Sequence, residues 1–131
     1  MLFRSTDVTG FGLLGHLRNV AAASGCGAVI RHAAVPVDDA ARRYAHQGIA
    51  PGGTHANWQF LRAWVQWPED LAQPEQLLLS DAQTSGGLLI AVAPERCDAL
   101  LDALQSEGTP CASLVGEIEV GAPGRIRVIA D

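Results

Sequence analysis

Lysine is absent from this chain of 131 residues, and all nine of its basic residues are arginine. A chain without lysine has no side-chain amine for a Schiff base and no lysine for a phosphate-binding P-loop. Any phosphate that it binds must therefore be held by backbone amides, by arginine or by a metal ion. Fourteen acidic residues give a net charge of −5, and no basic run is present. Nucleic-acid binding needs a concentrated cationic surface, so the composition argues against it.

Long apolar runs are also missing, since none approaches the ~20 residues of a membrane span, and no signal-peptide pattern opens the sequence. Three cysteines, Cys26, Cys97 and Cys111, are an odd number without CxxC spacing, which predicts neither a disulfide framework nor a zinc site. We expect them to be buried free thiols in a reducing cytoplasm. An apolar fraction of 48% with 18% charged residues predicts a soluble globular chain with one core.

Apolar periodicity alternates between helical and extended along the chain. Helical spacing predicts helices at residues 12–24, 38–48, 58–67 and 94–108, with a shorter one beginning near Pro74. The last long helix carries an apolar stripe of Cys97, Leu100, Leu101 and Leu104. Strands are predicted at 28–30, 88–92, 112–120 and 125–129, the second buried on both faces and the last two joined as a hairpin through 121–124. These elements predict an α/β (α+β) fold with a mixed sheet covered by helices.

A glycine-rich segment, Thr6-Asp7-Val8-Thr9-Gly10-Phe11-Gly12, directly precedes the strongest helical pattern. Free amides at a helix start form an anion site together with the helix dipole, and glycines let a ligand approach closely. Asp7 would repel a phosphate there unless a divalent cation lay between them, bound by the carboxylate and by phosphate oxygens. The alternative is that Asp7 or Thr9 caps the helix and the glycines allow tight packing.

Two further segments are rich in glycine and small polar residues. Residues 80–87 (SDAQTSGG) lead into the predicted strand with more hydrogen-bonding side chains than a turn needs, although an Asx-type turn is the alternative. Residues 50–54 (APGGT), with Asn57 nearby, are otherwise typical of a plain surface loop. The four histidines show no metal-ligand spacing, and His16 is typical of a packing residue. The three tryptophans are expected in the core or at an interface.

Together these segments resemble the C-terminal domain of the selenophosphate synthetase (selenide, water dikinase) family. The resemblance is carried by Thr6–His16 (TDVTGFGLLGH), Gly48–Asn57 (GIAPGGTHAN) and Leu79–Val92 (LSDAQTSGGLLIAV). It extends to a superfamily of ATP users that includes aminoimidazole ribonucleotide synthetase and thiamine-monophosphate kinase. The resemblance implies the fold of an aminoimidazole ribonucleotide synthetase C-terminal domain, as one domain over residues 1–131.

The family converts ATP, selenide and water into selenophosphate, AMP and phosphate with Mg²⁺. The resemblance implies that Asp7 ligates the Mg²⁺ on the ATP phosphates, and that Thr9, Gly10 and Gly12 line this site. The family's N-terminal half holds the nucleophilic cysteine or selenocysteine, its neighbouring lysine, further metal-binding aspartates and the main dimer interface, and it is absent from this sequence. We therefore expect a chain that is inactive alone, from an enzyme that is a cytoplasmic homodimer at full length. Ala82 departs from the family by replacing its usual proline.

Two alternatives stay open for the function. The chain can be a free-standing, non-enzymatic module that binds an anion, a nucleotide or a partner protein. It can also belong to another ATP-dependent kinase or synthetase of the same superfamily. An in-frame N-terminal half upstream of Met1 would argue against the free-standing module. Release of ADP rather than AMP by the full-length protein would favour another enzyme of the superfamily.

Overall fold

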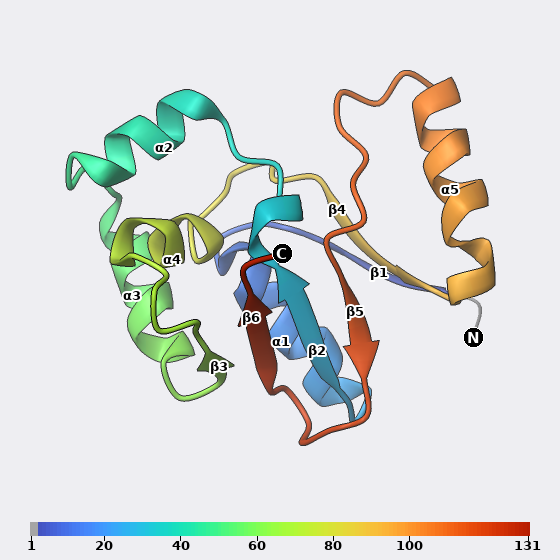
Figure 1. Cartoon of the computed structure of the whole chain (residues 1–131), viewed down its shortest axis with the longest axis horizontal. Helices are drawn as coiled ribbons and strands as arrows, with labels where there is room; N and C mark the ends of the chain where they lie inside the picture. The colour runs from blue at the N-terminus through green and yellow to red at the C-terminus, as the bar shows by residue number, and fades with distance from the viewer. Residues whose placement is uncertain (1–2) are drawn as a thin grey trace.

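Two sheets form the frame of the protein in the computed structural model, which describes residues 3–131 (Figure 1). The larger sheet is mixed and four-stranded, in the order β3 (Val65–Gln66), β6 (Ile126–Ile129), β2 (Gly27–Arg31) and β5 (Gly116–Glu119). β6 runs parallel to both β3 and β2, while β5 is antiparallel to β2. The smaller sheet is an antiparallel ribbon of β1 (Phe3–Asp7) and β4 (Leu88–Val92). The mixed α/β architecture predicted from the sequence is therefore confirmed.

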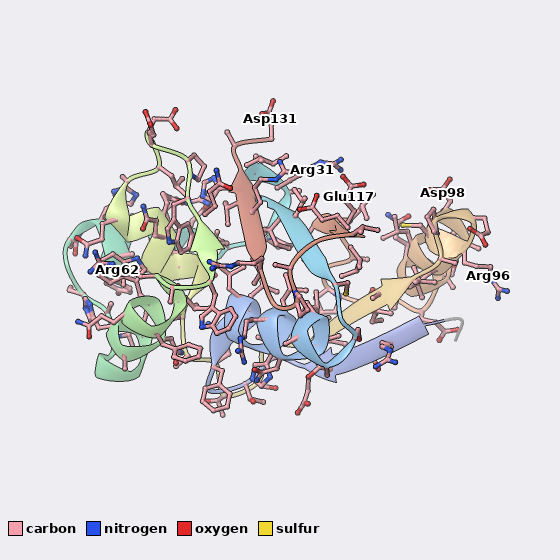
Figure 2. All side chains as sticks on the ribbon, turned by 90° about the horizontal axis from the view of Figure 1, so that it is seen from below. Arg31, Arg62, Arg96, Asp98, Glu117 and Asp131 are labelled. Atoms are coloured by element: carbon pink, nitrogen blue, oxygen red, sulfur yellow. The ribbon has the colours of Figure 1, made fainter. Side chains whose placement is uncertain are left out.

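The helices are distributed unevenly around these sheets. They are α1 (Gly12–Ala23), the short 3₁₀ helix η1 (His32–Ala34), α2 (Asp39–His46), α3 (Gly52–Leu61), α4 (Gln73–Leu79) and α5 (Pro94–Ser106). Figure 1 shows α1 behind the larger sheet, α2, α3 and α4 grouped on the β3 side, and α5 at the far end of the β1–β4 ribbon. In Figure 2 the labelled Arg62, at the end of α3, and Arg96, on α5, lie at opposite ends of the molecule.

The hydrophobic core lies between the larger sheet and the helices α1, α3 and α4. Leu14 and Leu17 of α1 pack in one cluster with side chains of β2, β3 and β6 and with the last residues of α3 and α4 (Ala28, Ile30, Val65, Ile126, Val128, Leu61 and Leu79). Leu14 and Leu61 have no exposed surface. Burying a leucine contributes ~1.5–3 kcal/mol, so this cluster fixes the position of the start of α1 and the end of α4.

Local sequence signals account for several element boundaries. The Asp38 carboxylate accepts hydrogen bonds from the amides of Ala40 and Ala41 at 2.7 and 3.3 Å, so it caps α2 at the start of the predicted helix. Gly48 follows α2 with a φ of +80°, a conformation that favours glycine. Pro74 lies in the first turn of α4, where its missing amide costs no helical hydrogen bond.

The predicted hairpin between the last two strands is wrong. β2 lies between β5 and β6 and pairs with both, so residues 121–124 cross from one side of β2 to the other. Gly124 turns the chain under α1 with a φ of +78°, and its amide donates to the Cys26 carbonyl at 3.0 Å. Pairing with the apolar, buried β2 displaces the local pairing that the short connection suggested.

β4 and α5 also differ from prediction. β4 is a strand, but among the described residues it pairs only with β1. None of its residues is fully buried, and Leu88 is 69% exposed. α5 is a helix in which no residue is buried, despite its apolar stripe. The expectation of buried thiols is wrong as well, because Cys111 is exposed and Cys26 and Cys97 are half-buried. All three cysteines are free, as predicted.

The helix in the middle of the chain begins earlier and ends earlier than predicted. Residues 50–54 are not a plain loop, because α3 begins at Gly52 and buries Thr54. α3 ends at Leu61 rather than before Pro68, and Val65 begins the short strand β3. No helix within residues 3–131 is long and apolar enough to cross a membrane.

Candidate functional site

The Asp7 segment links the ribbon to the core. β1, which the sequence analysis did not predict, ends at Asp7, and α1 begins five residues later at Gly12. The Asp7 side chain is exposed, and its carboxylate makes no hydrogen bond or ion pair with any residue in the range 3–131. An unpaired carboxylate therefore stands near the N-terminus of α1, where a helix dipole is positive.

The three glycine-rich segments of the sequence meet in space. Backbone hydrogen bonds join Val8 to both Gly86 and Gly87, from the Val8 amide to the Gly87 carbonyl at 2.9 Å and from the Gly86 amide to the Val8 carbonyl at 3.0 Å. A Cβ on Gly86 would lie 2.7 Å from the Val8 carbonyl oxygen, so no larger residue fits there. The Gln83 amide donates to the Thr9 carbonyl at 3.1 Å.

Helix α3 joins both segments through side chains. Asn57 donates through its Nδ2 to the carbonyl of Gly10 at 2.8 Å and to that of Ser80 at 3.1 Å. The buried Thr54 hydroxyl donates to Asp81 Oδ1 at 2.5 Å and accepts from the Ala82 amide at 3.2 Å. These bonds connect residues that are 23 to 47 positions apart in the sequence.

The geometry excludes two local roles that the sequence left open for these segments. α1 has Phe11 as its N-cap and no side-chain cap, so neither Asp7 nor Thr9 caps it. The Thr9 hydroxyl instead shares a hydrogen bond with His16 Nε2 at 3.0 Å. The Asp81 carboxylate bonds to the side chains of Thr54 and Gln83 rather than to a following amide, so residues 80–87 do not form the Asx-type turn.

The glycines of the first segment have different surroundings. Gly12 is buried with a φ of +72°, and a Cβ there would meet the backbone of Ser80 and Asp81 at 2.6–2.9 Å. Close packing of the two segments therefore accounts for this glycine. Gly10 is exposed, and a Cβ there would meet nothing within 4 Å. Within residues 3–131, the amides of Gly10 and Phe11 donate no hydrogen bond, so two consecutive backbone donors are free at this position.

The donor set fits a magnesium ion that is shared with a ligand. Mg²⁺ in phosphate-binding sites takes one or two carboxylates and completes its shell with water and phosphate oxygens. Asp7 supplies one free carboxylate three residues before Gly10, and the free amides of Gly10 and Phe11 suit phosphate oxygens. In residues 3–131 no group of three or more His, Cys, Asp and Glu side chains is arranged to hold a metal by itself. Asp7 therefore suits a bridging ligand rather than a complete protein cage.

The sequence identifies most of these residues as candidates, but it does not predict the hydrogen bonds and contacts between them. It placed Asp7, Thr9, Gly10 and Gly12 in one segment, and the structure joins that segment to residues 80–87. It gave His16 only a packing role, and it gave Asn57 none. His16 lies on α1 and bonds to Thr9, which precedes the helix by three residues. No local signal identifies the carbonyls that Asn57 reaches.

Comparisons with known proteins agree with this fold and with these segments. Residues 4–129 match the family described as AIR synthase related protein, C-terminal domain. The chain is 44% identical over 125 residues to a selenide, water dikinase of Rhizobium meliloti, covering 95% of the chain and 36% of the relative. It is 45% identical over 113 residues to that of Pelobacter propionicus, covering 86% and 32%. The resemblance to selenophosphate synthetases is thereby confirmed.

A solved structure supports the architecture. Thiamine-monophosphate kinase from Stenotrophomonas maltophilia has a TM-score of 0.61 with this chain at 20% identity, over 98% of the chain and 31% of the kinase. This likeness concerns the fold alone. The chain spans about a third of the length of the selenide, water dikinases that it matches.

Proposed function

Because the chain belongs to the AIR synthase related protein C-terminal domain family, we propose that it is the C-terminal domain of a selenophosphate synthetase. The complete enzyme would convert ATP, selenide and water into selenophosphate, AMP and phosphate. The observation that carries the proposal is the identity of 44–45% with selenide, water dikinases over most of this chain. The relatives are about three times longer, so an N-terminal domain would supply the nucleophile.

In this proposal the chain contributes one wall of the phosphate site. Asp7 would hold Mg²⁺, which when bound would neutralise phosphate charge during transfer. The open amides of Gly10 and Phe11 would donate to phosphate oxygens, and Thr9 would line the same wall. Gly12 would support the site indirectly, because it lets residues 80 and 81 pack closely against the segment that forms this wall. Electrostatic positioning of this kind supplies most of the catalysis in phosphoryl transfer.

The chain alone would lack the chemistry. It has no lysine, and none of its cysteines lies among the residues of the candidate site. Free thiols agree with action in the cytoplasm, where disulfides are rare. We place the complete enzyme there as a homodimer whose main interface lies outside this chain.

Titration of Mg·ATP into the purified chain tests its part in the site. We expect binding that depends on Mg²⁺ and that Asp7→Asn abolishes, measured by calorimetry, with circular dichroism showing the same fold in both proteins. Asp98→Asn, an exposed acid on α5 at one end of the molecule, is the matched control (Figure 2). Equal Mg·ATP binding by the protein with and without Asp7→Asn would contradict the metal assignment.

Activity distinguishes the proposed enzyme from the alternatives. With the N-terminal domain joined in frame, we expect selenide-dependent formation of AMP, and no such turnover from this chain alone. Release of ADP with another substrate would favour a related kinase. Absence of any upstream coding half would favour a free-standing binding module.

A further inference from the structure

We infer that Asn57 is a positioning residue of the phosphate wall, which fixes the Gly10–Phe11 peptide so that the Phe11 N–H faces the ligand. The inference deepens the proposed function and rests on it. Asn57 lies on α3, in neither of the backbone segments that pack at Gly12. Its amide nevertheless reaches a carbonyl in each of them, Gly10 at 2.8 Å and Ser80 at 3.1 Å.

Peptide geometry converts this bond into a direction for an amide. The carbonyl and the N–H of a planar trans peptide group point to opposite sides, and the residues 3–131 contain no cis peptide. The Gly10 carbonyl points towards Asn57, so the N–H of the same peptide group, that of Phe11, points away from α3. This N–H donates to no acceptor within the described part of the chain.

The preceding peptide group is held in the same way by the backbone. The Thr9 carbonyl accepts hydrogen bonds from the Gln83 amide at 3.1 Å and from the Gly12 amide at 2.9 Å. The N–H on the opposite side of that peptide group belongs to Gly10, and it is also without an acceptor in residues 3–131. The hydrogen bonds to the carbonyls of Thr9 and Gly10 therefore fix both peptide groups. They leave the amides of Gly10 and Phe11 pointing away from those bonds and without an acceptor.

Of these two peptide groups, the one after Gly10 depends on a side chain. Asn57 is the only side chain in the described residues that donates to the Gly10 carbonyl. Packing does not hold Gly10 either, because a Cβ there would meet nothing within 4 Å. Glycine also reaches more backbone conformations than other residues, so the peptide can rotate if the bond to Asn57 is removed. Asn57 therefore controls the direction of the Phe11 amide rather than touching the ligand.

The test compares Asn57→Ala with two other variants in ¹⁵N-labelled protein. Gln59→Ala is the matched control, because Gln59 is exposed on the same helix and makes no side-chain hydrogen bond with a described residue. Asn57→Gln keeps the amide donor and tests rescue. In the absence of ligand, we expect Asn57→Ala to change the N–H residual dipolar coupling of Phe11, while Gln59→Ala leaves this coupling unchanged.

The second readout is titration with Mg·ATP. We expect the Gly10 and Phe11 amide resonances to shift on binding, with an affinity about tenfold weaker in Asn57→Ala and largely recovered in Asn57→Gln. An unaltered Phe11 coupling in Asn57→Ala overturns the inference, and so does Mg·ATP binding that leaves the Phe11 resonance unmoved. If Asn57→Ala does not fold, Asn57→Ser repeats both measurements with a polar side chain that lacks the amide.

Failure of the proposed function has a different signature. If the chain binds no Mg·ATP and Asp7→Asn changes nothing, the phosphate wall is wrong, and Asn57 then has no ligand to position. Normal binding that Asp7→Asn abolishes but Asn57→Ala leaves unchanged contradicts the role of Asn57 alone.

Discussion

Gly12 lies so close to Asp81 that a Cβ on Gly12 would be 2.6 Å from the Asp81 carbonyl oxygen. The contact joins the start of α1 to the segment that follows α4. Gly12 also has a φ of +72°, which L-residues adopt only with strain. Two independent physical reasons therefore require glycine at this position.

Gly12→Ala is expected to destabilise the protein strongly. Left-handed backbone costs an alanine ~1–2 kcal/mol, and forcing the two segments apart costs a further ~1–3 kcal/mol. Gly25→Ala provides the control, because Gly25 has a similar φ of +68° but open space around it. Urea unfolding should show a loss at Gly12 larger than the loss at Gly25 by about the packing cost. Equal losses would show that the contact with Asp81 has no energetic consequence.

Thr54→Val tests the bridge between α3 and the segment after α4. Valine has nearly the shape of threonine, but it leaves the Ala82 amide without an acceptor and removes a donor from Asp81. Because Thr54 is 1% exposed, we expect a loss of ~1–3 kcal/mol in the free energy of unfolding. Thr84→Val, at an exposed position without side-chain hydrogen bonds in the described residues, should change it by less than ~0.5 kcal/mol.

Glu75 predicts how stability depends on pH. Partial burial acts to raise the pKa of this carboxyl, but hydrogen bonds from His46 and His32, together with the charge of Arg42, outweigh burial and lower the pKa below its ordinary value. Both histidine Nε2 atoms lie 2.8 Å from its oxygens. A group with a lowered folded pKa stabilises the fold above its unfolded pKa and loses this effect as the pH falls through the folded pKa.

Glu75→Gln should therefore destabilise the protein at pH 7, by ~1–2 kcal/mol from the loss of charged hydrogen bonds. The difference from the unsubstituted protein should shrink as the pH falls below the ordinary range of glutamate, about 4.3. Urea midpoints at a series of pH values measure this. Glu69→Gln, at an exposed residue without an ion pair in the described chain, should show no such trend.

In the complete enzyme, Asp7→Asn should reduce selenide-dependent AMP formation by at least about a hundredfold, because it removes a ligand charge from the metal site. The exposed side chain makes no hydrogen bond with residues 3–131, so the unfolding midpoint should stay unchanged. Retained turnover with an unchanged dependence on Mg²⁺ would mean that Asp7 is not a ligand.

Elements with local signals were predicted well from the sequence. α1 and α5 follow from apolar spacing, and α2 follows from the Asp38 cap and Gly48. β1 was missed because its sequence, FRSTD, has no apolar run and its pairing comes from β4, more than 80 residues away. The hairpin was wrongly predicted because sequence proximity says nothing about β2, which both strands prefer as a neighbour.

The candidate site shows the same division. The composition of the segment around Asp7 predicts either a metal and phosphate site or a capped, tightly packed helix start, and the family resemblance favours the first. The contacts that hold this segment in place could not be predicted. The packing of Gly12 on Asp81 and the hydrogen bond from Asn57 to Gly10 both join segments that are distant in the sequence. Burial was overestimated for β4 and α5, since an apolar pattern predicts a buried face but not the surface that covers it.

The position of β6 in the larger sheet sets the order in which this protein can fold. β6 lies between β3 and β2 and is parallel to both, although about 60 and 95 residues of chain separate it from them. On a ribosome, β2, β3 and α1 would leave the exit tunnel well before their shared partner is synthesised. The apolar faces of α1 and β2 would stay open until Ile126 and Val128 arrive, so we expect these faces to need chaperones until β6 has left the tunnel.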